Sequence, residues 1–312
     1  MPRPAVSPRD RVLAHRLRES LDDYAATVRP LPGIASSATK DTFIAQLVDS
    51  DRRRRFTLHV ATSDPHPKVL GEPLSAFDPH YAAVRCVRDG DFDEACWLVF
   101  LATHFGFHRH NRWALSGNFY RRLDAGQPWT WETVSAQPAA LRAWLDSNRT
   151  ALRSAGGPFG NHRKYESLAG NTQTGTGEAI ESYVEWVGSS HRAHFDDLCA
   201  ARSAQKSFAA AYASMADVAR FGRTARFDYL TMLGKLGIVD LLPDKLYLQG
   251  STGPLNAARL LVSGSTGAKT SAAELEDYLY DLGDHLGVTF DILEDGLCNW
   301  QKSPSRFISF RG

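Results

Sequence analysis

Apolar residues recur at helical spacing along most of this chain, and this periodicity limits the fold more than any other feature of the sequence. Across residues 9–28, Leu13, Leu17 and Leu21 fall on one side of a helix. Across residues 91–105 an acidic start leads into an almost wholly apolar stretch, which is typical of a helix at the centre of a core. The pattern therefore predicts a mainly α fold.

Chain length and turn residues predict how these helices are grouped. At roughly 100–200 residues per domain, the 312 residues allow one large domain or two lobes. We expect an N-terminal helical lobe over residues 1–200 and a C-terminal helical lobe over residues 201–312, joined in one compact unit. Residues 55–60 are the only segment that reads as a strand, and the sequence contains no repeat.

Charge is distributed unevenly, although the formal net charge is only +1. Residues 105–122 contain no acid, and a second basic stretch follows at residues 202–226. Residues 271–300 carry eight acids and neither lysine nor arginine. Faces of opposite sign suit a protein that binds a polyanion on one side.

Several classes of protein are disfavoured by what the sequence lacks. No apolar run approaches the roughly 20 residues that span a bilayer, and the first residues contain no apolar signal core, so we expect a cytoplasmic protein. The four cysteines form no CxxC pair and read as reduced. Walker, Rossmann and kinase motifs are absent, so we expect chemistry without ATP or a redox cofactor.

A turn-rich stretch at residues 248–261 reads as a phosphate-binding hairpin. Gly250 and Gly253 permit tight turning, and Pro254 suits the first turn of a helix. Free N–H groups at such a helix start favour a phosphate, and Arg259 adds positive charge. The stretch resembles the helix-hairpin-helix element of DNA glycosylases, with Gly-x-x-Gly in place of the usual Gly-x-Gly. A turn that only joins two helices is an equal alternative.

Three acids lie at a predicted helix start further along the chain. Asp291, Glu294 and Asp295 share one face of that helix. Since helix-hairpin-helix glycosylases place a catalytic aspartate at a helix start after the hairpin, the resemblance implies a catalytic acid among these three. Such a carboxylate stabilises a sugar cation or directs a water to the sugar. The alternative is an ordinary helix cap.

The segment from residue 160 to residue 168 crowds polar and charged residues into one loop, as cores seldom do. Lys164 is a candidate Schiff-base nucleophile if its pKa is lowered, and otherwise a phosphate ligand. Glu166 is a candidate general base or the ion-pair partner of Lys164. The other candidates in this segment are Asn161, His162, Arg163 and Tyr165.

Histidine and aromatic residues form a further group at residues 104–113. The spacing of His104, His108 and His110 allows a metal site, but no cysteine or carboxylate lies nearby, so we expect no bound metal. Base stacking or phosphate contact suits the neighbouring residues better. These neighbours are Phe107, Arg109, Arg112 and Trp113, and further candidates for pocket walls are Tyr120, Trp129, Trp131, Tyr183 and Trp186.

Four long motifs resemble the alpha-glutamyl/putrescinyl thymine pyrophosphorylase family, clade 3. The motifs start at Phe92, Phe159, Phe221 and Leu293, and they read FDEACWLVF, FGNHRKYESL, FGRTARFDYL and LEDGLCNWQK. The resemblance covers the chain from about residue 41 to its end. It implies a relationship to helix-hairpin-helix DNA glycosylases, among which some relatives excise bulky modified bases from phage DNA.

The resemblance and the residues together predict a DNA N-glycosylase that flips a hypermodified pyrimidine, such as a glucosylated hydroxymethylcytosine, out of phage DNA and excises it. Two alternatives remain: a transferase that replaces pyrophosphate on a hydroxymethyluracil-type base with an amino acid or polyamine, and a DNA-binding module without chemistry. The expected partner is double-stranded DNA with modified bases, with no cofactor and no obligate protein partner.

The candidate residues fall into three groups by expected role. The catalytic candidates are Asp291, Asp295, Glu294 and Lys164. The base-pocket candidates are Asn161, His162, Tyr165, Glu166, Asp228 and Trp300. The candidates for binding DNA phosphates are Arg163, Arg223, Arg226, Gly250, Gly253, Arg259, Arg109 and Arg112.

Overall fold

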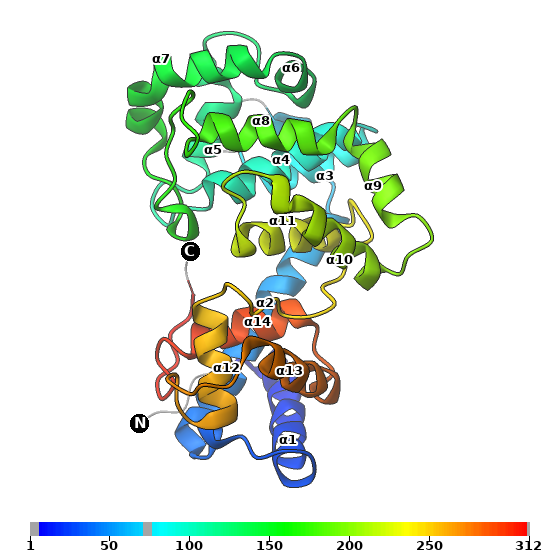
Figure 1. Cartoon of the computed structure of the whole chain (residues 1–312), viewed down its shortest axis with the longest axis vertical. Coiled ribbons are helices and arrows are strands. Elements are labelled where there is room, and N and C mark those ends of the chain that lie inside the picture. The colour runs from blue at the N-terminus through cyan, green and yellow to red at the C-terminus, as the bar shows by residue number, and fades with distance from the viewer. Residues whose placement is uncertain (1–5, 71–76, 311–312) are drawn as a thin grey trace. The chain divides into compact units, whose positions relative to one another are not determined.

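The computed structural model describes residues 6–70 and 77–310, with the side chain of Asn161 left out. Helices dominate these residues, and the only β-type pairings among them are two isolated bridges, His108 with Arg112 and Ser167 with Gly175. The mainly α fold expected from the periodicity is confirmed. Figure 1 shows the course of the helices along the chain.

The chain divides into two compact units, and one of them is built from both ends of the chain. Unit 1 comprises residues 1–56 and 243–311, and unit 2 comprises residues 57–242. This division differs from the expected boundary near residue 200, because residues 201–242 belong with the middle of the chain. The reason is long-range packing: α1 (Arg11–Thr27) packs on α13 (Ala272–Leu286).

Residues 55–60, which read as a strand, belong to a long helix, so that prediction was wrong. Helix α2 (Ser37–Thr62) runs through them without interruption. Ion pairs one helical turn apart support it, since Arg53 contacts Asp49 at 2.5 Å and Arg55 contacts Asp51 at 2.7 Å. Local pairing of charges thus outweighs the strand preference of the apolar residues that follow.

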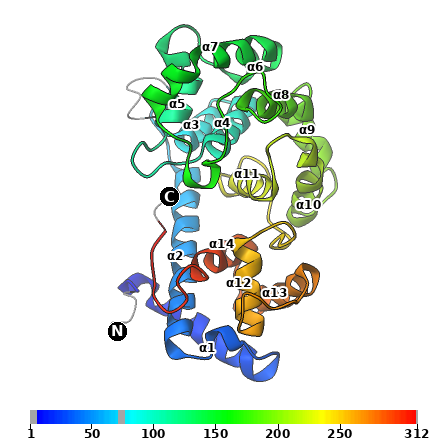
Figure 2. The same ribbon diagram turned by 60° about the vertical axis from the view of Figure 1, so that its left-hand side comes forward.

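Unit 1 is a group of helices around one apolar core (Figure 2). Its remaining helices are α12 (Gly253–Ser263) and α14 (Phe290–Trp300). Trp300 is fully buried in this core, packs against Phe43 and donates its indole N–H to the carbonyl of Thr39 at 3.3 Å. The base-pocket role expected for Trp300 therefore has no exposed ring face to support it.

Unit 2 surrounds the helix that the sequence placed at the centre of a core. Eleven of the fourteen residues of α4 (Phe92–Phe105) are buried, which confirms that prediction. The other helices of this unit are α3 (Pro79–Arg88), α5 (Ala114–Tyr120), α6 (Trp131–Ala136), α7 (Pro138–Gly156), α8 (Thr176–Val187), α9 (His191–Cys199), α10 (Ala204–Ser214) and α11 (Arg223–Lys235).

Aromatic residues that were candidates for pocket walls are part of this core instead. Tyr120, Trp129, Trp131 and Tyr183 are each at most 5% exposed. The Tyr183 hydroxyl lies 2.6 Å from Nε2 of His191 and 2.7 Å from the Tyr229 hydroxyl. Because buried polar groups stabilise a fold only when they are paired, this chain of contacts fixes α8, α9 and α11 in one arrangement.

Candidate functional site

The acidic start of α14 is neutralised by an arginine of α2. Asp295 accepts hydrogen bonds from Arg53 at 3.1 and 2.6 Å and from the amide of Asn299 at 2.8 Å. Burial works against the charge of Arg53, but Asp295 and Asp49 outweigh it and raise the pKa of Arg53. The carboxylate of Asp295 therefore belongs to a structural ion-pair network within unit 1.

Asp291 is even less accessible than Asp295. It is 5% exposed, and Oδ2 lies 3.6 Å from Nε of Arg54. Glu294 is partly buried beside it on the same helix. A carboxylate that meets a sugar must be reachable, and the geometry of Asp291 and Asp295 favours a role in holding α14 against α2. Their catalytic role stays a prediction.

The stretch at residues 248–253 joins α12 to the preceding loop. Gly250 has φ +77° and open space around it, whereas a side chain at Gly253 would meet the sulfur of Cys298 at 3.1 Å. Arg259 donates to the carbonyl of Thr270 at 3.4 Å. Gly253 thus serves close helix packing, and the phosphate-binding role of all three residues stays a prediction.

A carboxylate that the sequence analysis missed lies just before this stretch. Asp244 is partly buried and accepts a hydrogen bond from the Tyr247 hydroxyl at 2.6 Å. Among the described residues Asp244 forms no ion pair. Its charge is therefore not neutralised by a guanidinium, in contrast to that of Asp295.

The loop that holds Asp244 is fixed by α13. Tyr247 has φ +56°, an uncommon conformation for an aromatic residue, and this turn aims its hydroxyl at Asp244. The N–H groups of Leu246 and Leu248 both donate to the carboxylate of Glu276, at 2.6 and 2.8 Å. In sequence, a lone Asp in a Pro-Asp-Lys loop resembles an ordinary turn, so no signal distinguished it.

A second helix–turn–helix arrangement lies in unit 2, where α10 and α11 are joined by residues 215–222. The two helices pack through the rings of Phe208 and Phe227, 5.8 Å apart, and lie side by side in Figure 1. Arg220 has φ +63° in the turn, and Gly222 precedes α11. No side chain caps this helix start and no acid lies in its first turn. Its N–H groups are therefore suited to an anion.

The arginines of α11 lie beside this turn. Arg223 is 8% exposed, with its guanidinium 4.9 Å from the ring of Phe227. Arg226 donates to the carbonyl of Tyr212 at 3.3 Å. Arg223 is almost wholly buried and Arg226 is partly buried, and the predicted role of both at DNA phosphates stays a prediction.

Asp228, on the same helix, is a partly buried carboxyl in a positively charged neighbourhood. Burial raises its pKa, while His162, Arg163 and Arg223 act in the opposite direction. The structure therefore brings together Asp228 and three residues that the sequence analysis assigned to the base pocket or to phosphates. These four residues come from two segments more than fifty positions apart in the chain.

The loop at residues 160–166 divides into a buried and an exposed part. Arg163 is 7% exposed, and its Nε donates to the carbonyl of Thr103 at 3.0 Å. Burial lowers the pKa of Arg163, against the effect of Asp228 and then Glu166. Glu166 is paired with Arg220 at 3.0 Å. The partner expected from the sequence was Lys164, so the structure pairs Glu166 with a different cation, and its role in the base pocket stays a prediction.

The exposed part of this loop carries His162, Lys164 and Tyr165. The ammonium group of Lys164 lies 5.0 Å from the centre of the Tyr165 ring. Because Lys164 is surrounded by solvent and not by an apolar pocket, its position suits a phosphate ligand better than a Schiff-base nucleophile. Asn161 was also assigned to the base pocket, but its side chain lies outside the described residues.

The three histidines at residues 104–110 do not converge. His104 is buried, contacts the Thr176 hydroxyl at 3.0 Å and is neutral, since burial lowers its pKa to about 3. His110 is exposed and accepts from Arg109 at 2.8 Å. Within residues 6–70 and 77–310, no group of three metal-ligating side chains was found.

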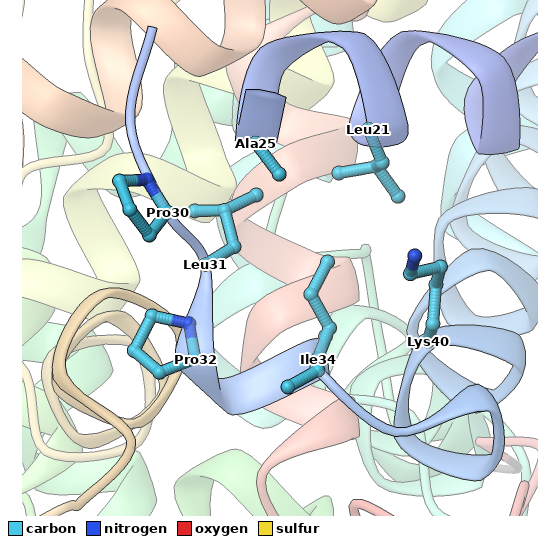
Figure 3. A pocket seen from close by; sticks show the side chains of 8 residues that line it. Leu21, Ala25, Pro30, Leu31, Pro32, Ile34 and Lys40 are labelled. Carbon is cyan, nitrogen blue, oxygen red and sulfur yellow. The ribbon is translucent and has the colours of Figure 1, made fainter. Parts of the chain in front are cut away.

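A small cavity in unit 1 is not formed by any predicted site residue. Figure 3 shows its lining, which comes from α1, the turn after it and the start of α2. The cavity has a volume of about 210 Å³. Leu21, Leu31 and Ile34 contribute apolar side chains, and Lys40 adds one cation, which pairs with Asp22. A base pocket needs several polar groups, so this cavity does not read as one.

Within the described residues, unit 2 contains the uncapped start of α11 with Arg223 and Arg226, and unit 1 contains Asp244, for which the structure shows no ion pair. The sequence model of alpha-glutamyl/putrescinyl thymine pyrophosphorylase, clade 3, matches residues 38–312. The chain belongs to this family, which is connected with the enzymatic modification of DNA bases.

Other comparisons add no relative. Neither the curated proteins nor the solved structures gave a match. No helix among the described residues has the length and apolar character needed to cross a membrane.

Proposed function

We propose that this protein is a DNA N-glycosylase that excises a hypermodified pyrimidine, such as a glucosylated hydroxymethylcytosine, from phage DNA. The observation that carries the proposal is the order of two elements: the α10–α11 turn with its uncapped helix start, and then Asp244 without an ion pair. This is the order that the resemblance to helix-hairpin-helix glycosylases implies, with the hairpin at residues 215–222 and not at residues 248–253.

The proposed chemistry assigns a separate task to each element. The helix start of α11, together with Arg223 and Arg226, holds backbone phosphates of the target strand. The carboxylate of Asp244 stabilises positive charge on the sugar while the bond from C1′ to the base breaks and its electron pair leaves with the base. Water then adds to C1′ and loses a proton, the departed base anion takes up a proton from solvent, and an abasic site and the neutral free base remain.

The hydrogen bond from Tyr247 keeps the carboxylate of Asp244 oriented in this scheme. A neutral hydroxyl donor brings no positive charge to the carboxylate. An arginine partner would cancel much of the charge, as Arg53 does for Asp295. This difference is why we assign the sugar-facing role to Asp244.

The test uses purified protein without metal or nucleotide, incubated with unmodified, hydroxymethylcytosine, glucosylated and thymine-hypermodified DNA. Alkali-labile sites are counted, and released bases are identified by mass spectrometry. Release of one modified base with an equal number of abasic sites supports the proposal. Intact strands on all four substrates contradict it, and DNA binding without any product supports a binding module instead.

A transferase is the second candidate, and the family description favours it because it names a pyrophosphorylase. The cations around Asp228 provide the positive charge that a pyrophosphate group needs. In this reaction an amine attacks the exocyclic methylene of the base, the carbon–oxygen bond to pyrophosphate breaks, and the amine loses a proton. Supplying pyrophosphorylated hydroxymethyluracil DNA with putrescine or glutamate distinguishes the two reactions, since only the transferase gives an aminated base in an intact strand.

A further inference from the structure

Two loops of unit 2 are locked together through their backbones. A side chain on Gly160 would lie 2.6 Å from the carbonyl carbon of Gly106 and 2.7 Å from the carbonyl oxygen of Phe107, so only glycine fits there. The N–H of Gly160 donates to the carbonyl of Phe105 at 2.8 Å. The loops at residues 106–113 and 160–166 therefore move as one surface.

The first loop is itself closed into a tight turn. His108 and Arg112 exchange two backbone hydrogen bonds, at 3.1 and 2.6 Å. The guanidinium of Arg112 lies 4.6 Å from the centre of the Phe107 ring. Arg109, Arg112 and their neighbour His110 are exposed, so this loop presents cations to solvent from a fixed frame.

The second loop presents an aromatic ring to solvent. Tyr165 is 83% exposed, more than any other aromatic residue among the large exposed apolar side chains of the described chain. Lys164 lies over its ring, and His162 is exposed two residues earlier. Such exposure suits a ring that meets a partner better than a ring that lines a pocket, and the base-pocket role expected for Tyr165 stays a prediction. An exposed aromatic ring offers a face on which a base can stack.

We propose that Tyr165 is a wedge that enters the base stack of duplex DNA at the position left empty when the target base is flipped out. The inference rests on the proposed action on a flipped base. The flanking cations of the two locked loops, Arg109, Arg112 and Lys164, hold the phosphates on either side of the opened step. Side chains that enter between bases are apolar or aromatic and need a rigid support, and the Gly106–Gly160 contact supplies it.

The test measures binding alone, on a duplex with one tetrahydrofuran abasic analogue and on the same duplex with all bases present. We expect the wild-type protein to bind the abasic duplex about tenfold more tightly, because one ring–base stack contributes roughly that factor. Tyr165→Ala removes this preference and leaves affinity for the intact duplex unchanged. Tyr165→Phe retains it, since the ring and not the hydroxyl enters the stack.

Two controls make the result specific. Tyr280→Ala removes an exposed tyrosine of unit 1, 54% exposed, and should alter neither affinity. Lys164→Ala should weaken binding to both duplexes equally and reduce the dependence of affinity on salt. An unchanged preference for the abasic duplex in Tyr165→Ala overturns the wedge.

The proposed function and the wedge can fail separately. Base release by the wild-type protein with an unchanged preference in Tyr165→Ala rejects the wedge and leaves the glycosylase in place. A lost preference in Tyr165→Ala with no base release from any modified DNA supports the wedge and rejects the glycosylase.

Discussion

Asp295 and Asp244 both belong to unit 1, and they lie in different electrostatic surroundings. Asp295 receives two hydrogen bonds from Arg53 and one from Asn299. Asp244 receives one hydrogen bond from the Tyr247 hydroxyl. In the sequence, the helix start that is rich in acids is a candidate catalytic site, whereas the single acid in this loop gives no such indication.

The number of acids in a segment does not show whether their carboxylates are free of a cationic partner in the folded chain. The acids of α14 face the arginines of α2, a helix almost 240 positions earlier in the chain. That partnership is visible only in the folded chain. A carboxylate that stabilises a cation in a reaction must not already be paired with a cation, so we place the chemistry at Asp244.

The largest expected effect comes from Asp244→Asn. It removes the charge while it keeps the shape and the contact with Tyr247, so base release should fall by about 10²–10³-fold. The free energy of unfolding should change by less than about 0.5 kcal/mol, since no ion pair is lost. Single-turnover base release and urea denaturation measure the two effects. Release within threefold of wild type would show that the charge of Asp244 is not needed for the reaction.

Glu94 is a third carboxyl, and it differs from Asp244 and Asp295 in being buried. Among the described residues, the structure shows no arginine paired with it. It accepts from the N–H of Trp131 at 2.6 Å, and burial raises its pKa from 4.5 to about 7. At about 1.36 kcal/mol per pKa unit, this shift corresponds to about 3 kcal/mol. The folded state binds the proton more tightly, so this stability is present below pH 4.5 and is lost as the pH rises through 7.

The measurement for Glu94 is urea denaturation of wild type and Glu94→Gln at pH 5 and pH 8. The wild type should lose stability relative to the variant between these values. Gln keeps an acceptor for Trp131 and carries no titrating proton, so it is a matched control for shape. Equal changes in both proteins would show that Glu94 ionises normally in the folded state.

Asp295→Asn should affect stability more than activity. The variant removes the charge of one carboxylate partner of Arg53 and keeps the contact with Asp49, which should lower the free energy of unfolding by about 1–2 kcal/mol, given that Arg53 and Asp295 are each about one third exposed. Base release at a temperature well below unfolding should stay near the wild-type rate. A hundredfold loss of release with unchanged stability would return the catalytic role to α14.

Tyr247→Phe is expected to have the smallest effect. It removes the hydroxyl that donates to Asp244 and keeps the ring, so base release should fall by about threefold to tenfold. The charge of Asp244 remains, and therefore the loss should stay well below that of Asp244→Asn. The same single-turnover assay detects it, and a loss as large as that of Asp244→Asn would mean that the hydroxyl itself takes part in the reaction.

Local patterns in the sequence predicted some of the helices. The acidic start and apolar body of α4 and the helix of α14 follow from such patterns, whereas α3, α5 and α9 were not predicted. The strand expected at residues 55–60 failed because ion pairs between residues four apart favour α2 there. The boundary of unit 1 depends on the packing of α1 against α13, which no local pattern encodes.

The candidate site was predictable only in part, for the same reason. The sequence drew attention to residues 160–166 and to the arginines of α11, and the structure brings Arg163 and Arg223 to one carboxyl, Asp228. The lock between Gly106 and Gly160 joins segments that are far apart in sequence. The turn that directs the Tyr247 hydroxyl toward Asp244 requires a positive φ at Tyr247. The sequence gives no indication of this conformation, because aromatic residues rarely adopt it.

The catalytic role of Asp244 is tested most directly by single-turnover base release from glucosylated hydroxymethylcytosine DNA and from the other modified substrates, by wild type, Asp244→Asn and Asp295→Asn in parallel. Wild type and Asp295→Asn should release the same base, and Asp244→Asn should lose about 10²–10³-fold of this release. Release by Asp244→Asn at the wild-type rate, together with loss of release in Asp295→Asn, would show that the catalytic carboxylate lies on α14 and not at Asp244.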